Sequence, residues 1–188
     1  MNNSVEIITI GDELLIGQVI DTNSAWMGEK LNENGFCVKQ ITSIPDDKSH
    51  ILTAIANAFN NADVILITGG LGPTKDDITK KSLCEFFNTE LIFDEASYDN
   101  VKKFIRNRPQ NMDNELNRQQ AMVPKSCTPI LNKEGTAPIL WFERINKILV
   151  SLPGVPHEME CAMTDEILPR LKDFFECPSR QQITMIVY

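Results

Sequence analysis

The sequence predicts a three-layer α/β/α domain with a mostly parallel β-sheet, and three observations support this prediction. Short β-branched runs alternate with amphipathic helical segments from the start of the chain, which is the order of elements in α/β folds. The run 64–68, VILIT, is apolar throughout, as in strands that are covered on both faces of a parallel sheet. A glycine-rich turn follows this run directly, at the strand end where α/β folds bind ligands.

The first half of the chain alternates regularly between strand and helix. Polar residues at 21–24 provide N-caps for one helix, and Gly35 provides its C-terminal stop. Apolar residues at helical spacing indicate a second helix after Asp47. The expected elements are a strand at 5–10, a helix at 21–34, a strand at 36–44, a helix after 47, a strand at 64–68 and a helix after 77.

The second half is expected to be less regular. Residues 94–123 have a polar, helical composition, interrupted at 106–110, and predict a helical excursion beside the sheet. Strands are expected at 128–131, 139–142 and 147–151, followed by a turn at 152–156 and a last amphipathic helix. The predicted organisation is one domain over 1–176 and a tail, 177–188, that forms the start of a following domain cut off here.

Composition restricts the class of partner and the compartment. Lys and Arg number 18 against 26 Asp and Glu, a net charge of −8, so no nucleic acid polymer is expected to bind through a broad basic face. None of the five cysteines is spaced as CxxC, so their spacing indicates neither a zinc site nor a redox motif. The N-terminal apolar run is too short for a signal or membrane segment. We therefore expect a cytoplasmic protein with reduced thiols and no membrane contact.

The segment 68–77, TGGLGPTKDD, is the sharpest candidate site. Three glycines in four positions allow a tight turn and remove Cβ atoms that would block a ligand. Successive N–H groups in such a turn, with the N-terminus of the next helix, bind anions. The alternative is that the glycines serve only the turn and the aspartates only cap the helix. The candidate phosphate-binding residues here are Gly69, Gly70, Leu71, Gly72 and Thr74.

Carboxylates follow three predicted strands at one edge of the sheet, at 12–13, 46–47 and 76–77. Each pair taken alone is explained by a helix cap or a solvated loop. Together, beside a bound phosphate, they would repel it unless a divalent cation lay between them. The sequence therefore predicts a metal-assisted phosphate site. The candidate metal ligands are Asp12, Asp46, Asp76 and Asp77.

Two further segments have features of a ligand site. Asp21 and Asn23 offer hydrogen bonds to a ligand, although a helix cap explains them as well and is the favoured reading. Gly154 lies in a segment, 152–158, whose alternative role is a rigid strand-to-helix turn. His157 has no Ser or Cys nucleophile in an elbow motif nearby, so triad chemistry is not indicated.

These motifs together resemble the molybdopterin-binding (MoCF) superfamily and, within it, the N-terminal domain of CinA proteins. TGGLGPTKDD is similar to the glycine-rich motif of the superfamily, and IPDD at 44–47 to the segment with its second functional aspartate. The opening IGDELL, with Gly17 and the DTN at 21–23, the GTAP at 135–138 and the LPGVPHEM at 152–159 resemble the CinA pattern. The resemblance covers residues 4–175, with one departure: Ile139 follows Ala-Pro where the family usually has Gly.

The resemblance implies that Asp77 and Asp46 belong to an active site, joined by Asp12, and that Gly135 and Gly154 lie beside the ligand. It implies hydrolysis of ADP-ribose to AMP and ribose 5-phosphate with Mg²⁺, Mn²⁺ or Co²⁺, in a homo-oligomer, dimer or trimer. Many such proteins also carry a C-terminal nicotinamide-mononucleotide deamidase domain. The alternatives are a molybdopterin-binding or adenylyltransferase-type enzyme, and a non-catalytic nucleotide-binding module of a larger CinA-type protein.

Overall fold

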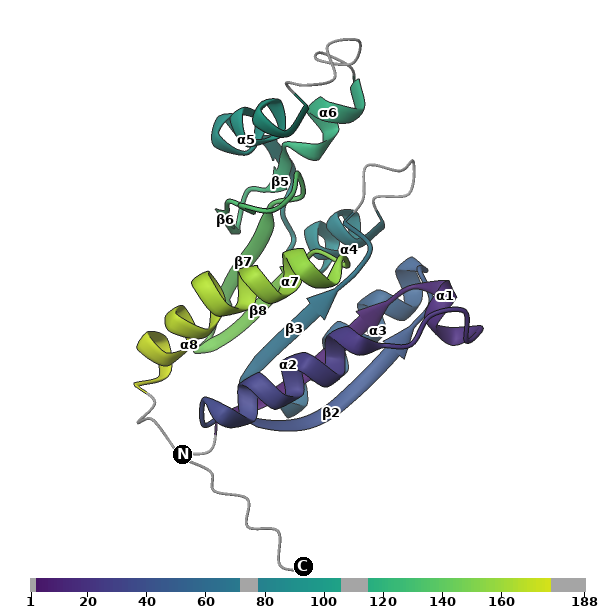
Figure 1. The fold of residues 1–188 in the computed structure, drawn as a ribbon, viewed down its shortest axis with the longest axis vertical. Coiled ribbons are helices and arrows are strands. Elements are labelled where there is room, and N and C mark those ends of the chain that lie inside the picture. Colours follow the sequence, from purple (N-terminus) through teal and green to yellow (C-terminus); the bar gives the residue numbers. More distant parts are fainter. Residues whose placement is uncertain (1–2, 72–77, 106–114, 177–188) are drawn as a thin grey trace, which may run out of the picture.

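The computed structural model describes residues 3–71, 78–105 and 115–176, and its centre is a six-stranded sheet (Figure 1). The strand order is β2-β1-β3-β8-β7-β6. The first four strands run parallel, and β7 and β6 are antiparallel to their neighbours. The strands are β1 (Ser4–Ile10), β2 (Cys37–Ile44), β3 (Val64–Thr68), β6 (Thr128–Ile130), β7 (Ile139–Arg144) and β8 (Lys147–Leu152).

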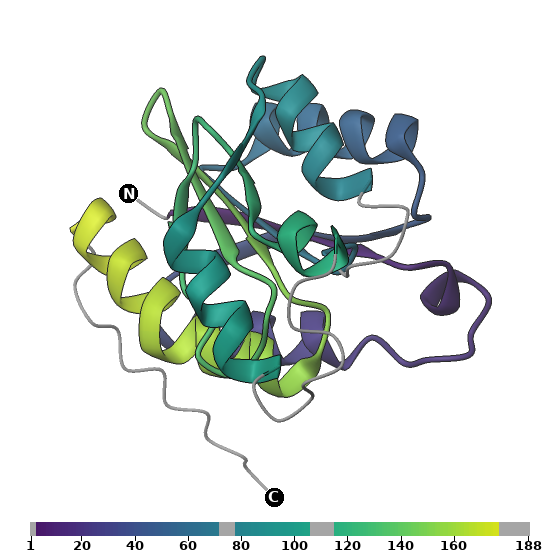
Figure 2. The same cartoon turned by 90° about the horizontal axis from the view of Figure 1, so that it is seen from above.

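Helices cover both faces of the sheet, so the predicted three-layer α/β/α arrangement is confirmed (Figure 2). Side chains alternate along β1: Val5 and Ile7 join the core under α2, α7 and α8, whereas Ile8 and Ile10 join the core under α3 and α4. All residues of β3 are buried, as its apolar sequence predicts. The helices are α2 (Thr22–Glu33), α3 (Lys48–Asn61), α4 (Ile78–Phe86), α7 (Pro156–Ala162) and α8 (Leu168–Phe175).

The excursion beyond the sheet differs in part from the prediction. Helices α5 (Glu95–Ile105) and α6 (Glu115–Gln120) are present, but the expectation of helix up to 123 is wrong. Residues Met122–Pro124 form β5, which pairs antiparallel with β4 (Leu91–Phe93) in a separate two-stranded sheet. The strand forms because its partner, about 30 residues earlier in the chain, supplies the hydrogen bonds.

The last helix contains a π-helical turn, Met163–Ile167, between α7 and α8. Pro169 follows it, and proline has no N–H to donate to the carbonyl four residues earlier. The fully buried side chains of this helix recur every four residues: Met159, Met163, Ile167 and Leu171. They pack on β-strand side chains in the core under α2, α7 and α8.

Among the residues with assigned structure, no helix is both long enough and apolar enough to cross a bilayer. The predicted tail, 177–188, lies outside those residues, and its role as the start of a further domain stays a prediction.

Candidate functional site

The candidate site lies at the carboxyl ends of β1, β3 and β8. The chain passes from β1 to β2 on one side and then crosses back to β3 on the other, so β1 and β3 form a topological switch point. A cavity of about 420 Å³ opens there, within the size range of small-molecule sites. It is lined by parts of 9–23, by 68–71, by Gln120, by 136–137 and by parts of 153–158.

The turn after β3 strongly favours glycine at its first two positions. Gly69 and Gly70 have φ of +103° and +67°, a region that residues with a Cβ rarely adopt. A Cβ on Gly69 would lie 2.2 Å from the carbonyl oxygen of Ile10, and one on Gly70 would lie 2.1 Å from Thr79 Oγ1. Gly69, Gly70 and Leu71, which are candidate phosphate-binding residues, line the cavity.

Asp21 and Asn23 both line the cavity but have different roles. Asp21 is the N-cap of α2 and accepts a main-chain hydrogen bond there, as the sequence favours. Asn23 Nδ2 donates to Thr68 Oγ1 at 3.2 Å and to the Gly154 carbonyl at 2.9 Å. Asn23 therefore joins α2 to the end of β3 and to the turn after β8. Its Oδ1 is buried and has no hydrogen-bond partner among the described residues, so it can accept from a ligand.

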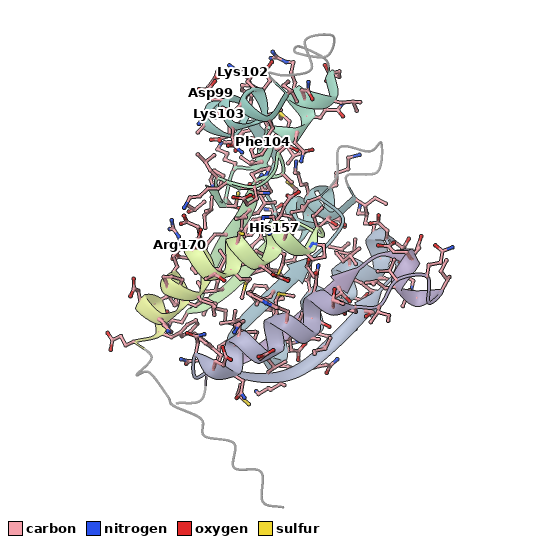
Figure 3. The ribbon with its side chains drawn as sticks, viewed as in Figure 1. Asp99, Lys102, Lys103, Phe104, His157 and Arg170 are labelled. Atoms are coloured by element: carbon pink, nitrogen blue, oxygen red, sulfur yellow. The ribbon has the colours of Figure 1, made fainter. Side chains whose placement is uncertain are left out.

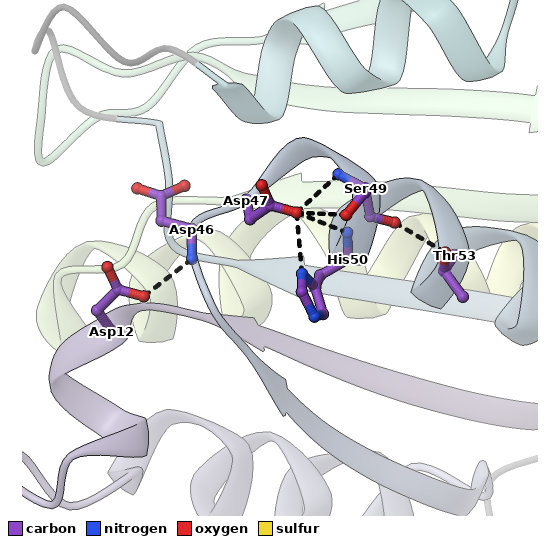
Figure 4. A network of polar contacts seen from close by, with 6 residues as sticks. All are labelled: Asp12, Asp46, Asp47, Ser49, His50 and Thr53. Atoms are coloured by element: carbon purple, nitrogen blue, oxygen red, sulfur yellow. Dashed lines mark hydrogen bonds and ion pairs between the residues drawn. The ribbon is translucent and has the colours of Figure 1, made fainter.

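Asp12 and Asp46 are brought together, although they are separated by 34 residues (Figure 4). The Asp46 N–H donates to Asp12 Oδ1 at 3.3 Å. A Cβ on Gly70 would lie 3.6 Å from Asp46 Oδ1, so the Asp46 carboxylate stands beside the glycine turn. Neither aspartate lines the cavity itself. The predicted pairing of carboxylates at one sheet edge is present for these two strands.

Asp47 is turned away from this pair and caps α3 (Figure 4). Its Oδ1 accepts from the side chain and N–H of Ser49 and from the N–H of His50, and the His50 ring nitrogen lies 2.9 Å away. These bonds, led by the Ser49 hydroxyl, hold the pKa of Asp47 well below its usual range.

The remaining predicted residues of the glycine-rich motif lie outside the described residues and stay predictions: Gly72, Thr74, Asp76 and Asp77.

Gly135 lies behind the cavity wall rather than in it. A Cβ on Gly135 would meet Glu158 Oε2 at 2.0 Å, and Asn132 Nδ2 donates to that same oxygen at 2.6 Å. The next two residues, Thr136 and Ala137, line the cavity. Gly135 therefore lets this loop pack against α7.

Gly154 lines the cavity directly. Its Cβ would lie 3.2 Å from the Cα of Gly69, so the turns after β3 and β8 pack closely. Ile139, the departure from the family pattern, is fully buried in the core at the start of β7. Its side chain thus lies in the core while Thr136 and Ala137 still face the cavity.

Glu13 and Gln120 are among the cavity residues that were not predicted as ligand-binding. Glu13 follows Asp12, and its carboxylate folds over Gly11, where a Cβ would lie 2.4 Å from Oε1. Gln120, at the end of α6, is 3% exposed, and its Nε2 donates to the Leu71 carbonyl at 3.2 Å. Gln120 Oε1 has no hydrogen-bond partner within the described part of the chain. No local signal identifies Gln120, because its place depends on α6 packing over a turn 49 residues earlier.

Comparisons with known proteins identify the family of this chain. The family model described as the probable molybdopterin binding domain matches residues 6–173. A CinA-like protein of Flavobacterium psychrophilum is 44% identical over 97% of this chain, which spans 44% of that relative's length. The crystal structure of the protein CinA from Thermoplasma acidophilum superposes with a TM-score of 0.80 at 33% identity, over 92% of this chain and 98% of that one.

The fold is shared more widely. The molybdopterin biosynthesis enzyme MoaB of Thermus thermophilus has a TM-score of 0.62 at 18% identity, over 94% of this chain and 99% of that one. At this identity the similarity concerns the fold alone. The match of the family model over most of the chain is decisive: the chain belongs to the molybdopterin-binding domain family and, within it, to the CinA-like proteins.

Proposed function

We propose that this domain is a metal-dependent nucleotide diphosphate hydrolase that cleaves ADP-ribose to AMP and ribose 5-phosphate. The observation that carries the proposal is the Asp46 carboxylate beside the glycine turn, with the Asp12 carboxylate hydrogen-bonded to the Asp46 N–H. A phosphate held by the turn would lie next to the Asp46 carboxylate, and a cation between the two would offset their repulsion.

The cavity offers complementary groups for a nucleotide. The N–H groups of the turn at Gly70 and Leu71 can hold a diphosphate. Asn23 Oδ1 and Gln120 Oε1 are buried acceptors, for which the structure gives no partner among the residues it describes. Buried acceptors favour a ligand that donates N–H or O–H groups to them. Ribose hydroxyls and a base amino group are such donors.

The residues present fit a divalent metal ion by their chemistry. Asp12 and Asp46 supply carboxylate oxygens, the ligands preferred by Mg²⁺ and suited to Mn²⁺, with Co²⁺ as a further candidate. By the family resemblance, Asp77 and Asp76 would complete the set. When bound, such an ion polarises a phosphoryl oxygen and lowers the pKa of a coordinated water. The turn would hold the diphosphate close to the Asp46 carboxylate.

The test is AMP release from ADP-ribose by the whole chain, measured by chromatography with Mg²⁺, Mn²⁺ or Co²⁺ and with chelator. We expect metal-dependent AMP formation, and a loss in kcat on the order of 10²-fold or more in Asp46→Asn. The matched control is Asp47→Asn, the neighbouring carboxylate, which caps α3. Asparagine caps helices as well as aspartate, so activity should stay within about twofold. Undiminished turnover by a folded Asp46→Asn protein contradicts the proposal.

A second candidate is binding of a molybdopterin-type ligand, as in an adenylyltransferase-type enzyme, and it is favoured by the family match over residues 6–173. Competition binding separates the two: the hydrolase proposal expects ADP-ribose to displace a fluorescent adenine nucleotide more strongly than a pterin does. Preferential displacement by a pterin favours the second candidate. Tight nucleotide binding without turnover under any metal indicates a non-catalytic nucleotide-binding module.

A further inference from the structure

Three side chains of metal-ligating type converge on the surface outside the cavity. Glu134 comes from the loop between β6 and β7, and His157 and Cys161 come from α7 (Figure 3 labels His157). Their ligand atoms all lie within 4.8 Å of one another. His157 Nε2 lies 3.4 Å from Glu134 Oε2, and His157 Nδ1 lies 3.9 Å from Cys161 Sγ. Among the residues that the structure describes, this is the only such group of three.

The spacing of the two α7 residues suits a metal ion. Positions four apart on a helix lie one above the other on the same face. His157 and Cys161 therefore project side by side, at a spacing that recurs between ligands in zinc sites. Cysteine spacing alone did not indicate this site, because two of its three ligands are not cysteines.

The third ligand stands on an anchored loop. The Glu134 N–H donates to Asn132 Oδ1 at 3.0 Å. Asn100 Nδ2 donates to the carbonyls of Asn132 and Gly135, at 2.8 Å and 3.0 Å. These bonds fix the backbone on both sides of Glu134, whose carboxylate reaches His157 of α7.

The electrostatic surroundings of Cys161 favour the binding of a cation. The carboxylates of Glu134, Asp165 and Glu160 lie near the Cys161 sulfur and give this surface a negative potential. The same negative potential attracts a positive ion, and an ion that binds the sulfur displaces its proton.

We propose that Glu134, His157 and Cys161 form a transition-metal site of the Zn²⁺ class, separate from the carboxylate pair of Asp12 and Asp46. One sulfur, one imidazole and one carboxylate are a donor set for Zn²⁺ rather than for Mg²⁺. Three protein ligands leave a fourth tetrahedral position for water.

A metal ion at this place would fasten two walls of the cavity to each other. The loop that carries Glu134 continues into Thr136 and Ala137, and α7 carries Pro156 and Glu158, all of which line the cavity. In the structure, the hydrogen bond from Asn132 to Glu158 already joins these walls. The ion would add a second connection, so the site braces the rim of the nucleotide pocket.

The test is a Co²⁺ titration of the whole chain under reducing conditions, followed by the near-ultraviolet thiolate-to-cobalt charge-transfer band. We expect a band that saturates at one equivalent and disappears on addition of Zn²⁺. Cys161→Ser should abolish the band, and His157→Gln and Glu134→Gln should each weaken affinity at least about tenfold. The matched control is Cys37→Ser, an exposed cysteine on β2, which should leave the band unchanged.

Other results would overturn the site. One such result is the absence of a band, and another is a band that is retained in Cys161→Ser or lost in Cys37→Ser. Unchanged Co²⁺ affinity in both His157→Gln and Glu134→Gln would mean an adventitious ion only. Asp46→Asn separates this proposal from the proposed hydrolase: it should keep the charge-transfer band, because carboxylates contribute none. Zn²⁺ should also raise the Tm of the unmodified chain and not that of Cys161→Ser.

Discussion

Replacement of Gly70 by alanine tests the conformation of the glycine turn. Gly70 has φ +67°, and a Cβ there would lie 2.1 Å from Thr79 Oγ1 and 3.2 Å from Thr79 Cβ. Thr79 is fully buried at the start of α4, so it has little room to move. Gly70→Ala therefore meets both a backbone cost and a steric cost.

The two costs can be separated by magnitude. Left-handed backbone costs about 1–2 kcal/mol for a residue with a Cβ, and overpacking of a buried site costs about 1–3 kcal/mol. Gly70→Ala should thus lower the free energy of unfolding by about 2–5 kcal/mol. Gly17 has φ +74° and nothing within 4 Å of its Cβ position, so Gly17→Ala should cost only about 1–2 kcal/mol. For a chain of this size the Tm of Gly70→Ala should fall by on the order of 10 °C.

The assay is urea unfolding followed by circular dichroism and tryptophan fluorescence, in chelator and without ligand. Gly70→Ala should cost less free energy of unfolding in the Thr79→Ala background than in the unmodified chain. The reason is that Thr79→Ala removes the nearest clashing atom. Equal stability of Gly70→Ala and Gly17→Ala would refute the close contact with Thr79. An equal cost of Gly70→Ala in both backgrounds would refute Thr79 as its partner.

Three further outcomes are expected. Asn23→Ala removes the hydrogen bonds that join α2 to the ends of β3 and β8, and should cost about 1–3 kcal/mol in urea unfolding. Burial raises the pKa of Asp63, but hydrogen bonds from Ser4 and the charges of Lys147 and Lys39 together outweigh it, and the net pKa is lowered. This stabilisation is therefore present at neutral pH and is lost as pH falls below about 4, and unfolding of Asp63→Asn should lack that part of the pH dependence. Burial raises the pKa of Cys127 to about 12, so in native protein at pH 8 mass spectrometry should find Cys127 unalkylated by iodoacetamide and the exposed Cys37 alkylated.

Local sequence is sufficient to predict an element when its own residues determine its burial or its ends. The apolar run of β3 and the cap and stop of α2, at Asp21 and Gly35, are such signals. The strand Met122–Pro124 could not be predicted in this way, because three residues form a strand only when a distant partner aligns with them.

The residues of the candidate site also fall into two groups, those that local sequence predicts and those that it does not. Gly69 and Gly70 can be predicted because the backbone of the turn itself requires glycine. The pairing of Asp12 with Asp46 follows from two parallel strands that end at one edge. Gln120 and the cluster around His157 depend on packing between segments that no pattern links along the chain.

The π-helical turn in the last helix sets the angular phase of its buried face. Residues in an α-helix advance about 100° each, so side chains spaced by four drift about 40° per step. Over Met159, Met163, Ile167 and Leu171 that drift would turn the last side chain away from the sheet, yet all four are fully buried. The wider turn at Met163–Ile167 takes up the excess rotation. The four-residue repeat therefore keeps its buried face only because the π-turn is present. Deletion of a single residue from Met163–Ile167 would rotate α8 by about 100° relative to α7.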